Sequence, residues 1–250
     1  MKIILVSDLH LVAPGKTLFG MDPLRGLEAC IADINRTHAD ADLVVFAGDL
    51  TDDGEAAAYE ALAERIVHLA PPHRFMMGNH DDRARFLRTL SQPADEDGFI
   101  QSSVDIDGTR IILLDTLRPG HVDGLLCETR LRWLGRQLVG AAEALLFLHH
   151  PPFRLGIPSL DECRLGEPDK LLSLIRRHGN VRHLFAGHVH RLAHGSWQGI
   201  PFTTVRGTNH QSALRLEGPH EVSFEAPAYS VVLVDHDAVI VHTQELSPGE

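Results

Sequence analysis

Residues 1–10 read MKIILVSDLH and give the clearest indication of the fold class. The apolar run Ile3–Val6 leads directly into Ser7, Asp8 and His10, the pattern of a strand buried on both faces that ends in polar side chains. Similar runs rich in Val, Ile, Leu and Phe follow at Leu43–Ala47, Arg74–Met77, Arg110–Leu114, Ala144–Leu148, His183–Ala186, Tyr229–Asp235 and Val239–Thr243. We therefore predict an α/β protein whose strands are largely buried.

Segments with helical periodicity lie between these runs. Asp22 and Pro23 have the residue types of an N-cap and a first helical position, and apolar residues recur every three or four positions from Leu24 to Ile34. Further helices are predicted around Leu62–Leu69, Leu131–Leu138 and Leu171–Gly179, and longer loops at Leu11–Met21, Leu117–Cys127, Phe153–Pro168 and Arg206–Pro227. We expect a single domain over residues 1–250 with two packed sheets, in which residues 206–250 form a β-rich C-terminal part.

Composition limits the possible partners. The 250 residues include 23 Lys and Arg against 34 Asp and Glu, a net charge of −11 with the 17 His neutral. Such a charge repels phosphate backbones, so we expect no nucleic acid polymer as a partner, and an anionic substrate needs a local positive centre. No apolar run reaches the roughly 18 residues of a membrane helix, so no membrane partner is expected. Three Cys without paired spacing and an N-terminus without a signal-peptide pattern predict a cytoplasmic protein.

Polar residues of a restricted kind follow five of the apolar runs. The segments are Asp8 with His10, Gly48-Asp49, Gly78-Asn79-His80-Asp81, His149-His150-Pro151 and Gly187-His188-Val189-His190. In open α/β sheets, ligands bind beyond the carboxyl ends of the strands, so these segments are expected to converge on one crevice. His nitrogen with Asp or Asn oxygen is a donor set for Zn, Mn, Fe or Co. Seven ligands exceed what one ion with an open position takes, so the count predicts two ions.

These five segments, in this order, resemble the motifs of the calcineurin-like metallophosphoesterases. Within that superfamily, Gly15-Lys16, Phe19-Gly20 and Gly207-Thr208-Asn209-His210-Gln211 are similar to bacterial class III cyclic nucleotide phosphodiesterases and related glycerophosphodiesterases. The resemblance covers residues 1–211. It implies the αββα architecture of that superfamily, in which two packed mixed β-sheets are sandwiched by helices.

The resemblance also implies a role for each polar residue. Two divalent transition metal ions (Fe, Mn, Zn or Co) would be bridged by Asp49 and by a water or hydroxide. The expected metal ligands are Asp8, His10, Asp49 and His190 at the first ion, and Asn79, His149 and His188 with Asp49 at the second. His80 would contact the substrate, either steadying a non-bridging oxygen or protonating the leaving alkoxide. Asp81 would either orient His80 or cap a helix that begins near Arg83, and His150, which precedes two prolines, is expected to pack in a turn.

The second motif separates two substrate classes. Metal-dependent protein phosphatases have Gly-Asp-x-x-Asp-Arg-Gly, whereas residues 48–54 here read GDLTDDG, with an acid in place of the arginine. A phosphomonoester dianion benefits from that guanidinium more than a diester monoanion does. We therefore expect a phosphodiesterase for small phosphodiesters, either 3′,5′-cyclic nucleotides or glycerophosphodiesters. The alternatives are a phosphomonoesterase or a nuclease at the same site, and a non-catalytic interaction scaffold, against which the complete ligand set argues.

Several further residues are candidates for the substrate pocket. Those expected to bind substrate are Asn79, His80, Arg206, Asn209 and His210, with His121 as a further pocket residue. His220 is expected on the surface. The family resemblance suggests a homodimer or a higher homo-oligomer.

Overall fold

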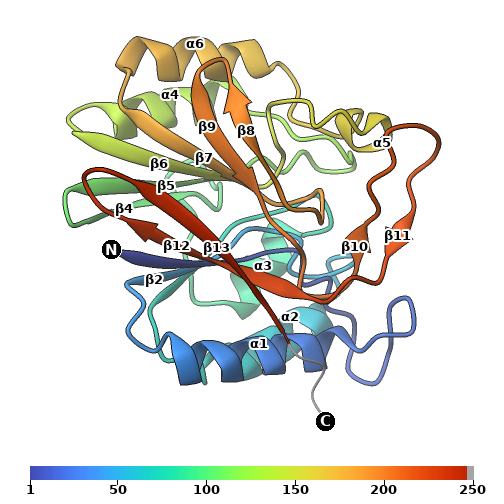
Figure 1. The fold of residues 1–250 in the computed structure, drawn as a ribbon. Helices are drawn as coiled ribbons and strands as arrows, with labels where there is room; N and C mark the ends of the chain where they lie inside the picture. The colour runs from blue at the N-terminus through green and yellow to red at the C-terminus, as the bar shows by residue number, and fades with distance from the viewer. Residues whose placement is uncertain (247–250) are drawn as a thin grey trace.

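The computed structural model describes residues 1–246, in which two β-sheets pack face to face between two layers of helices (Figure 1). The first sheet has the strand order β13-β12-β1-β2-β3, with β1 (Lys2–Val6), β2 (Leu43–Phe46), β3 (His73–Phe75), β12 (Ala228–Val234) and β13 (Val239–Glu245). The second has the order β4-β5-β6-β7-β9-β8, with β4 (Ser102–Ile106), β5 (Thr109–Leu114), β6 (Glu143–Leu148), β7 (Val181–Ala186), β8 (Ala193–Trp197) and β9 (Ile200–Thr204). A two-stranded ribbon pairs β10 (Gln211–Ser212) with β11 (Val222–Ser223).

Both large sheets are mixed. Strands β1, β2 and β3 are parallel to one another, and β12 and β13 extend that sheet by antiparallel pairing. In the second sheet β5, β6, β7 and β9 are parallel, while the edge strands β4 and β8 are antiparallel to their neighbours. The parallel strands of each sheet therefore end on one side, which is where loops between strands and helices build sites.

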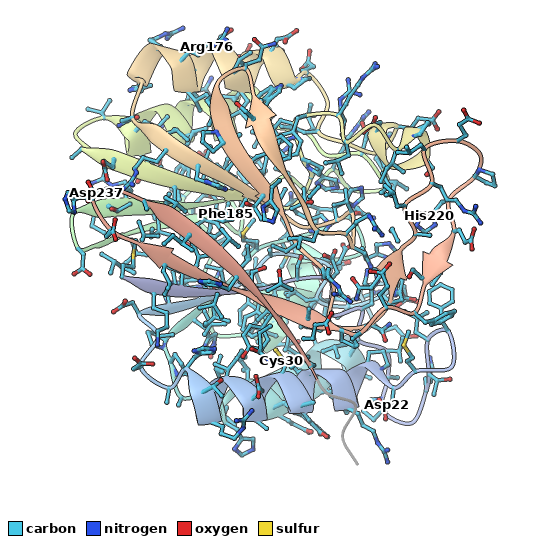
Figure 2. All side chains as sticks on the ribbon, in the orientation of Figure 1. Asp22, Cys30, Arg176, Phe185, His220 and Asp237 are labelled. Carbon is cyan, nitrogen blue, oxygen red and sulfur yellow. The ribbon has the colours of Figure 1, made fainter. Side chains whose placement is uncertain are left out.

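The helices cover the outer faces. They are α1 (Pro23–Thr37), α2 (Ala56–Ile66), α3 (Arg83–Thr89), α4 (Glu128–Leu138), α5 (Pro158–Asp161) and α6 (Pro168–His178). Figure 1 shows α1 and α2 below the first sheet and α4 and α6 above the second. The Asp22 carboxylate accepts hydrogen bonds from the backbone N–H groups of Leu24 and Arg25 at the start of α1, and Gly179 closes α6 with a left-handed φ of 71°. Cys30 on α1 is buried against the first sheet (Figure 2).

The strands are apolar on both faces because each face meets a different core. In β1, Ile3 and Leu5 pack between the sheets, whereas Ile4 and Val6 pack against the helices of the first layer. The second sheet repeats this division, with Phe147 between the sheets and Leu146 under α4 and α6. Double burial thus explains the continuous apolar runs, and the predicted architecture of two mixed sheets between helices is confirmed.

Edge elements were missed by the sequence patterns. Strand β4 alternates between half-buried and exposed residues, and β8 contains the exposed His194, Gly195 and Ser196, so neither has a continuous apolar run. The short helix α5 lies inside the segment expected to be a loop, and α2 ends at Ile66, before Leu69. The last four residues of the predicted C-terminal part 206–250 lie outside the described residues. Within the described chain, no helix combines the length and apolarity needed to cross a membrane.

One buried histidine makes the stability of this fold depend on pH. His183 lies on β7, its Nε2 is 3.0 Å from the Thr203 hydroxyl, and burial, with a smaller effect of His194, lowers its pKa to about 4. The folded state keeps this imidazole neutral, whereas the unfolded state takes up a proton below pH 6.5. The free energy of unfolding is therefore unaffected by this residue above pH 6.5 and decreases as the pH falls from 6.5 toward 4. At pH 4.5 we expect this residue to lower the free energy of unfolding by about 2 kcal/mol.

Urea unfolding at pH 7.5 and pH 4.5 measures this effect. The free energy of unfolding of His183→Gln should fall by about 2 kcal/mol less between the two pH values than that of the unsubstituted protein. His236→Gln, at a side chain that is 87% exposed, is the matched control and should behave like the unsubstituted protein. An identical pH dependence in His183→Gln and the control would contradict the assignment.

Candidate metal centre

The carboxyl ends of the parallel strands bring the predicted polar residues together. Asp8 and His10 follow β1, and their backbone N–H groups donate to the carbonyls of Gly48 and Asp49 after β2, at 3.1 and 2.9 Å. From the second sheet, the backbone N–H of His188 after β7 donates to the Asp8 carboxylate at 3.1 Å. The loops of the two sheets thus meet at one place, as the sequence predicts.

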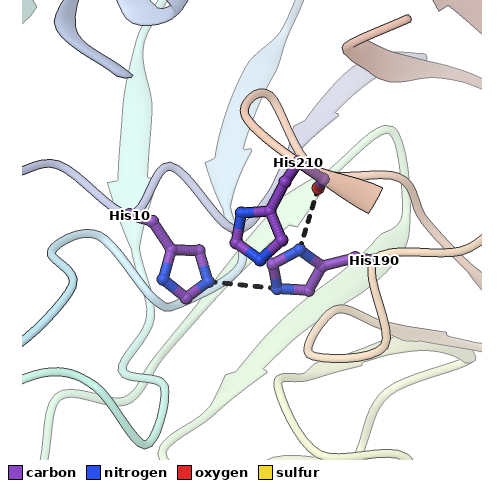
Figure 3. A group of neighbouring side chains, drawn as sticks. All are labelled: His10, His190 and His210. Atoms are coloured by element: carbon purple, nitrogen blue, oxygen red, sulfur yellow. Dashed lines mark hydrogen bonds between the residues drawn. The ribbon is translucent and has the colours of Figure 1, made fainter. Parts of the chain in front are cut away.

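Four buried side chains form the first half of the cluster. The donor atoms of Asp8, His10, Asp49 and His190 all lie within 4.8 Å of one another. Nε2 of His10 is 3.0 Å from Nε2 of His190, 3.6 Å from Oδ2 of Asp49, and Nε2 of His190 is 3.4 Å from Oδ1 of Asp8. Figure 3 shows the two imidazoles with these nitrogens facing each other. Four oxygen and nitrogen donors in this arrangement can hold a divalent cation.

The second half shares Asp49 with the first. Oδ2 of Asp49 lies 3.2 Å from Nε2 of His149, and the rings of His149 and His188 are 5.1 Å apart. The same carboxylate oxygen is therefore within 3.6 Å of an Nε2 atom from each half of the cluster, that of His10 and that of His149. Asn79 lines the adjoining cavity with His188. A carboxylate placed between two imidazole groups can bridge two ions.

Unpartnered polar atoms mark the space between these side chains. Eleven buried side-chain atoms have no hydrogen-bond partner within residues 1–246, and four of them belong to predicted ligands: Asp8 Oδ2, Asn79 Oδ1, His149 Nε2 and His188 Nδ1. Buried polar atoms are ordinarily paired, and an unpaired set calls for an ion or water. All four atoms are oxygen or nitrogen donors of the predicted ligand residues, so the side chains present fit a dinuclear centre.

The other ring nitrogens are held by the protein. Nδ1 of His149 donates to the Ala47 carbonyl at 2.7 Å, and Nδ1 of His190 donates to the His210 carbonyl at 2.9 Å. Nδ1 of His10 lies 3.0 Å from the Asp52 carboxylate. Such contacts direct the free Nε2 lone pair toward the cluster and raise its basicity. His150 differs, because Thr116 and Val122 engage both of its nitrogens, in agreement with the predicted packing role.

Backbone conformation contributes to the same geometry. Nine non-glycine residues in 1–246 have positive φ, and five of them are candidate ligands: Asp8 (54°), His10 (46°), Asp49 (48°), His188 (67°) and His190 (45°). Left-handed backbone is unfavourable for such residues and gathers at functional sites. Gly78 packs so closely on the Asp49 carboxylate and backbone that a Cβ atom would overlap both. The site therefore needs a glycine at this position.

Burial and the carboxylates set the protonation states. Burial opposes ionisation of Asp49, but His149 and His10 outweigh it and hold the pKa of Asp49 well below its usual range. Burial, followed by His149, lowers the pKa of His188 to about 3. For His149, Asp49 and Asp8 outweigh burial and raise the pKa to about 9. Asp49 is thus ready to bind a cation, whereas His149 must release a proton when one binds.

Asp81 neither hydrogen-bonds to His80 nor caps α3. Its carboxylate accepts hydrogen bonds from the backbone N–H groups of Leu50, Thr51 and Gly78 at 2.9–3.2 Å and from the Tyr59 hydroxyl at 2.9 Å. The N-cap of α3 is Asp82, whose carboxylate accepts from the Arg85 N–H. Nδ1 of His80 donates to the backbone carbonyl of Asp52 instead. Asp81 therefore shapes the backbone around Asp49.

A cavity of about 390 Å³ opens over the cluster, and it separates the substrate candidates into two groups. Asn79, His80 and His210 line it. Arg206 does not, because its guanidinium bonds to Glu245 and to the Ala226 carbonyl. Asn209, buried beside His210, is not among the described lining residues. His121, whose Nδ1 is 3.7 Å from the Asp123 carboxylate, is not among them either, although its neighbour Val122 is.

Two residues of the cavity wall, Asp52 and His220, lie outside the predicted set of site residues. Asp52 holds His10 through its carboxylate and His80 through its carbonyl, and the run of two acids at 52–53 in the second motif was the available signal. His220 is exposed, as expected, and it also belongs to the cavity wall, where the Ser212 hydroxyl lies 3.0 Å from its Nε2 (Figure 2).

Comparison with known proteins identifies the family. A sequence model described as calcineurin-like phosphoesterase matches residues 1–192. The chain belongs to this family. The phosphoesterase is 41% identical to a protein of Rhodopseudomonas palustris named probable cyclic nucleotide phosphodiesterase, over 97% of this chain and 91% of the relative. It is 32% identical to a probable glycerophosphodiester phosphodiesterase of Arcobacter nitrofigilis, over 100% of this chain and 95% of the relative.

Solved structures agree on the fold of the phosphoesterase. A dimetal phosphatase from Danio rerio superposes with a TM-score of 0.75 at 15% sequence identity, over 98% of this chain and 96% of the zebrafish chain. At that identity the likeness shows the fold alone. The resemblance of the five motifs to this superfamily is thus confirmed by the family match and by the fold.

In this phosphoesterase, Asp52→Ala is expected to weaken metal affinity about 10–100-fold, because His10 loses the carboxylate that fixes its ring. The backbone carbonyl that holds His80 remains. Competition with a fluorescent chelator measures the affinity. Asp53→Ala, at the exposed neighbouring carboxylate, should leave it unchanged, and equal affinities for the two variants would disprove the orienting role of Asp52.

Proposed function

We propose that the protein is a dinuclear-metal phosphodiesterase that hydrolyses small phosphodiesters. The observation that carries the proposal is the proximity of one oxygen, Asp49 Oδ2, to Nε2 of His10, at 3.6 Å, and to Nε2 of His149, at 3.2 Å. One ion would be held by Asp8, His10 and His190, the other by Asn79, His149 and His188, and Asp49 would be shared by both. The mixed nitrogen and oxygen donors suit Fe, Mn, Zn or Co.

When bound, the two cations supply a hydroxide at neutral pH and polarise the phosphoryl oxygens. The protein's own residues complete the reaction. His80 lies in the cavity wall with Nδ1 donating to the Asp52 carbonyl, which leaves Nε2 directed to the substrate. In its protonated form, His80 can give the Nε2 proton to the leaving alkoxide, and it can also hold a non-bridging oxygen. Its backbone N–H donates to Asp49 at 3.0 Å, which fixes His80 relative to the bridge.

Two observations favour diesters over monoesters. Residues 48–54 carry Asp52 and Asp53 where protein phosphatases of this superfamily have Asp and Arg, so the cavity lacks that guanidinium. The two relatives reported above are named as phosphodiesterases, for cyclic nucleotides and for glycerophosphodiesters. A phosphomonoesterase is the second candidate. A cytoplasmic location and a homo-oligomeric state remain predictions.

A comparison of two chromogenic esters tests the proposal. Protein reconstituted with Mn²⁺ should hydrolyse bis-p-nitrophenyl phosphate faster than p-nitrophenyl phosphate, because the diester needs less positive charge. Faster cleavage of the monoester would reverse the assignment. A panel of cyclic nucleotides, nucleoside 2′,3′-cyclic phosphates and glycerophosphocholine then identifies the diester class.

A further inference from the structure

An unusual turn lies at the mouth of the cavity. Leu18 and Met21 exchange backbone hydrogen bonds of 2.9 and 3.0 Å, so Phe19 and Gly20 are the two central residues of a tight hairpin turn. Their φ values are 52° and 79°, the pattern of a type I′ turn, in which Asn-Gly is the preferred pair. A bulky side chain is disfavoured at positive φ. Local backbone preference therefore does not explain a phenylalanine here.

Phe19 faces the candidate metal centre and not the hydrophobic core. Its side chain is 52% exposed and forms part of the cavity wall. The Phe19 ring lies 4.7 Å from the ring of His210, which in turn lies 5.1 Å from His10 and 4.4 Å from His190. Figure 3 shows His210 beside these two candidate ligands. A series of rings thus leads from the cluster to the cavity mouth.

We propose that Phe19 is a stacking platform for a nucleobase, so that cyclic nucleotides are the preferred diesters of this site. The inference rests on the proposed function, because a phosphate held at the cluster directs the rest of the substrate outward past His210. In a nucleotide, the ribose would lie next to His210, and the base attached to it would lie over the ring of Phe19. Base stacking on an aromatic side chain stabilises binding, and it does so for any of the bases. The unfavourable backbone conformation of the turn is then explained by the need to expose the face of the Phe19 ring to the substrate.

A quaternary ammonium group is the other ligand that an aromatic ring attracts. Recognition of such groups uses a cage of several aromatic side chains. Among the described residues that line the cavity, Phe19 is the one Phe, Tyr or Trp. A single open face suits a flat base, whereas it leaves a choline headgroup mostly in water.

Removal of the ring from the protein and of the base from the ligand tests the platform. Calorimetry on the metal-loaded protein compares AMP with ribose 5-phosphate, which lacks the base. The unsubstituted protein should bind AMP about 10-fold more tightly, and Phe19→Asn should reduce this ratio to about one. Because Asn-Gly is favoured in a type I′ turn, Phe19→Asn should not lower the melting temperature. Phe224→Asn, at a phenylalanine that is 68% exposed outside the described cavity wall, should keep the full ratio.

Kinetics provides the second measurement. Phe19→Asn should raise KM for cyclic AMP about 10-fold without a matching fall in kcat, and glycerophosphocholine hydrolysis should be unaffected. An unchanged AMP to ribose 5-phosphate ratio in Phe19→Asn would overturn the platform and leave the proposed function intact. A larger effect on glycerophosphocholine than on cyclic AMP would overturn the base assignment. Failure of the unsubstituted enzyme to cleave any diester would instead overturn the proposed function.

Discussion

His80→Ala is expected to lower kcat by about 10²–10⁴-fold while the protein keeps its full metal content. His80 lies in the cavity wall and bonds to the protein through Nδ1 and its backbone N–H, and it is not one of the side chains with an orphaned donor atom in the cluster. Its removal should therefore take away proton transfer and leave the ion sites intact. Turnover of a diester, together with elemental analysis of the same sample, measures both quantities.

The leaving group distinguishes the two roles of His80. As a general acid it should matter more for an alkoxide than for p-nitrophenolate, which leaves without protonation, so the loss should be larger for cyclic AMP than for bis-p-nitrophenyl phosphate. An equal loss with both substrates would favour a role in holding a phosphoryl oxygen. His236→Ala, far out on an exposed turn, is the control. Full activity of His80→Ala toward both substrates would falsify either role.

Asp49→Asn should remove the bridge between the two ions. The amide has the shape of the carboxylate and retains one oxygen, but it lacks the negative charge that two cations share. We expect bound metal to fall from two ions per chain to one or fewer, and kcat/KM to fall by at least about 10³-fold. Metal content after gel filtration and diester turnover are the measurements.

A neighbouring carboxylate serves as the control for this variant. Asp53→Asn removes the same charge four residues later, at an exposed side chain. It should keep two ions and near-normal turnover. If Asp49→Asn also kept two ions, the dinuclear arrangement around Asp49 would be wrong. If both variants lost metal, net charge and not bridging would be the cause.

Much of the fold could be predicted because doubly buried strands are apolar throughout. The runs at Ile3–Val6 and Ala144–Leu148 correspond to β1 and β6, since both faces of each strand meet a core. The edge strands β4 and β8 could not be found in this way, because one face or more is solvated and their pattern is broken. The helix caps Asp22 and Gly179 were predictable because capping depends on local backbone geometry.

Long-range contacts could not be predicted from residue types. Arg206 looked like a substrate contact, but its guanidinium is taken up by Glu245 from the last strand. Asp81 stood beside His80 in the sequence, yet its side chain turns to the backbone of residues 50 and 51. His220 is on the surface, as its sequence context predicts, but its place in the cavity wall depends on the position of the β10–β11 ribbon and could not be read from the sequence.

Three properties of the site can be read from the amino-acid sequence: which donor atoms are available, that they follow strands, and that their order along the chain resembles one family of phosphoesterases. Donor type and strand ends are properties of single residues and short segments, so they can be read locally. Three other properties require the three-dimensional arrangement: the Asp49 carboxylate is close to two histidines, Asp52 and not Asp81 holds His80, and Phe19 reaches the cavity. These are distances between segments far apart in the chain, and they depend on how the two sheets pack.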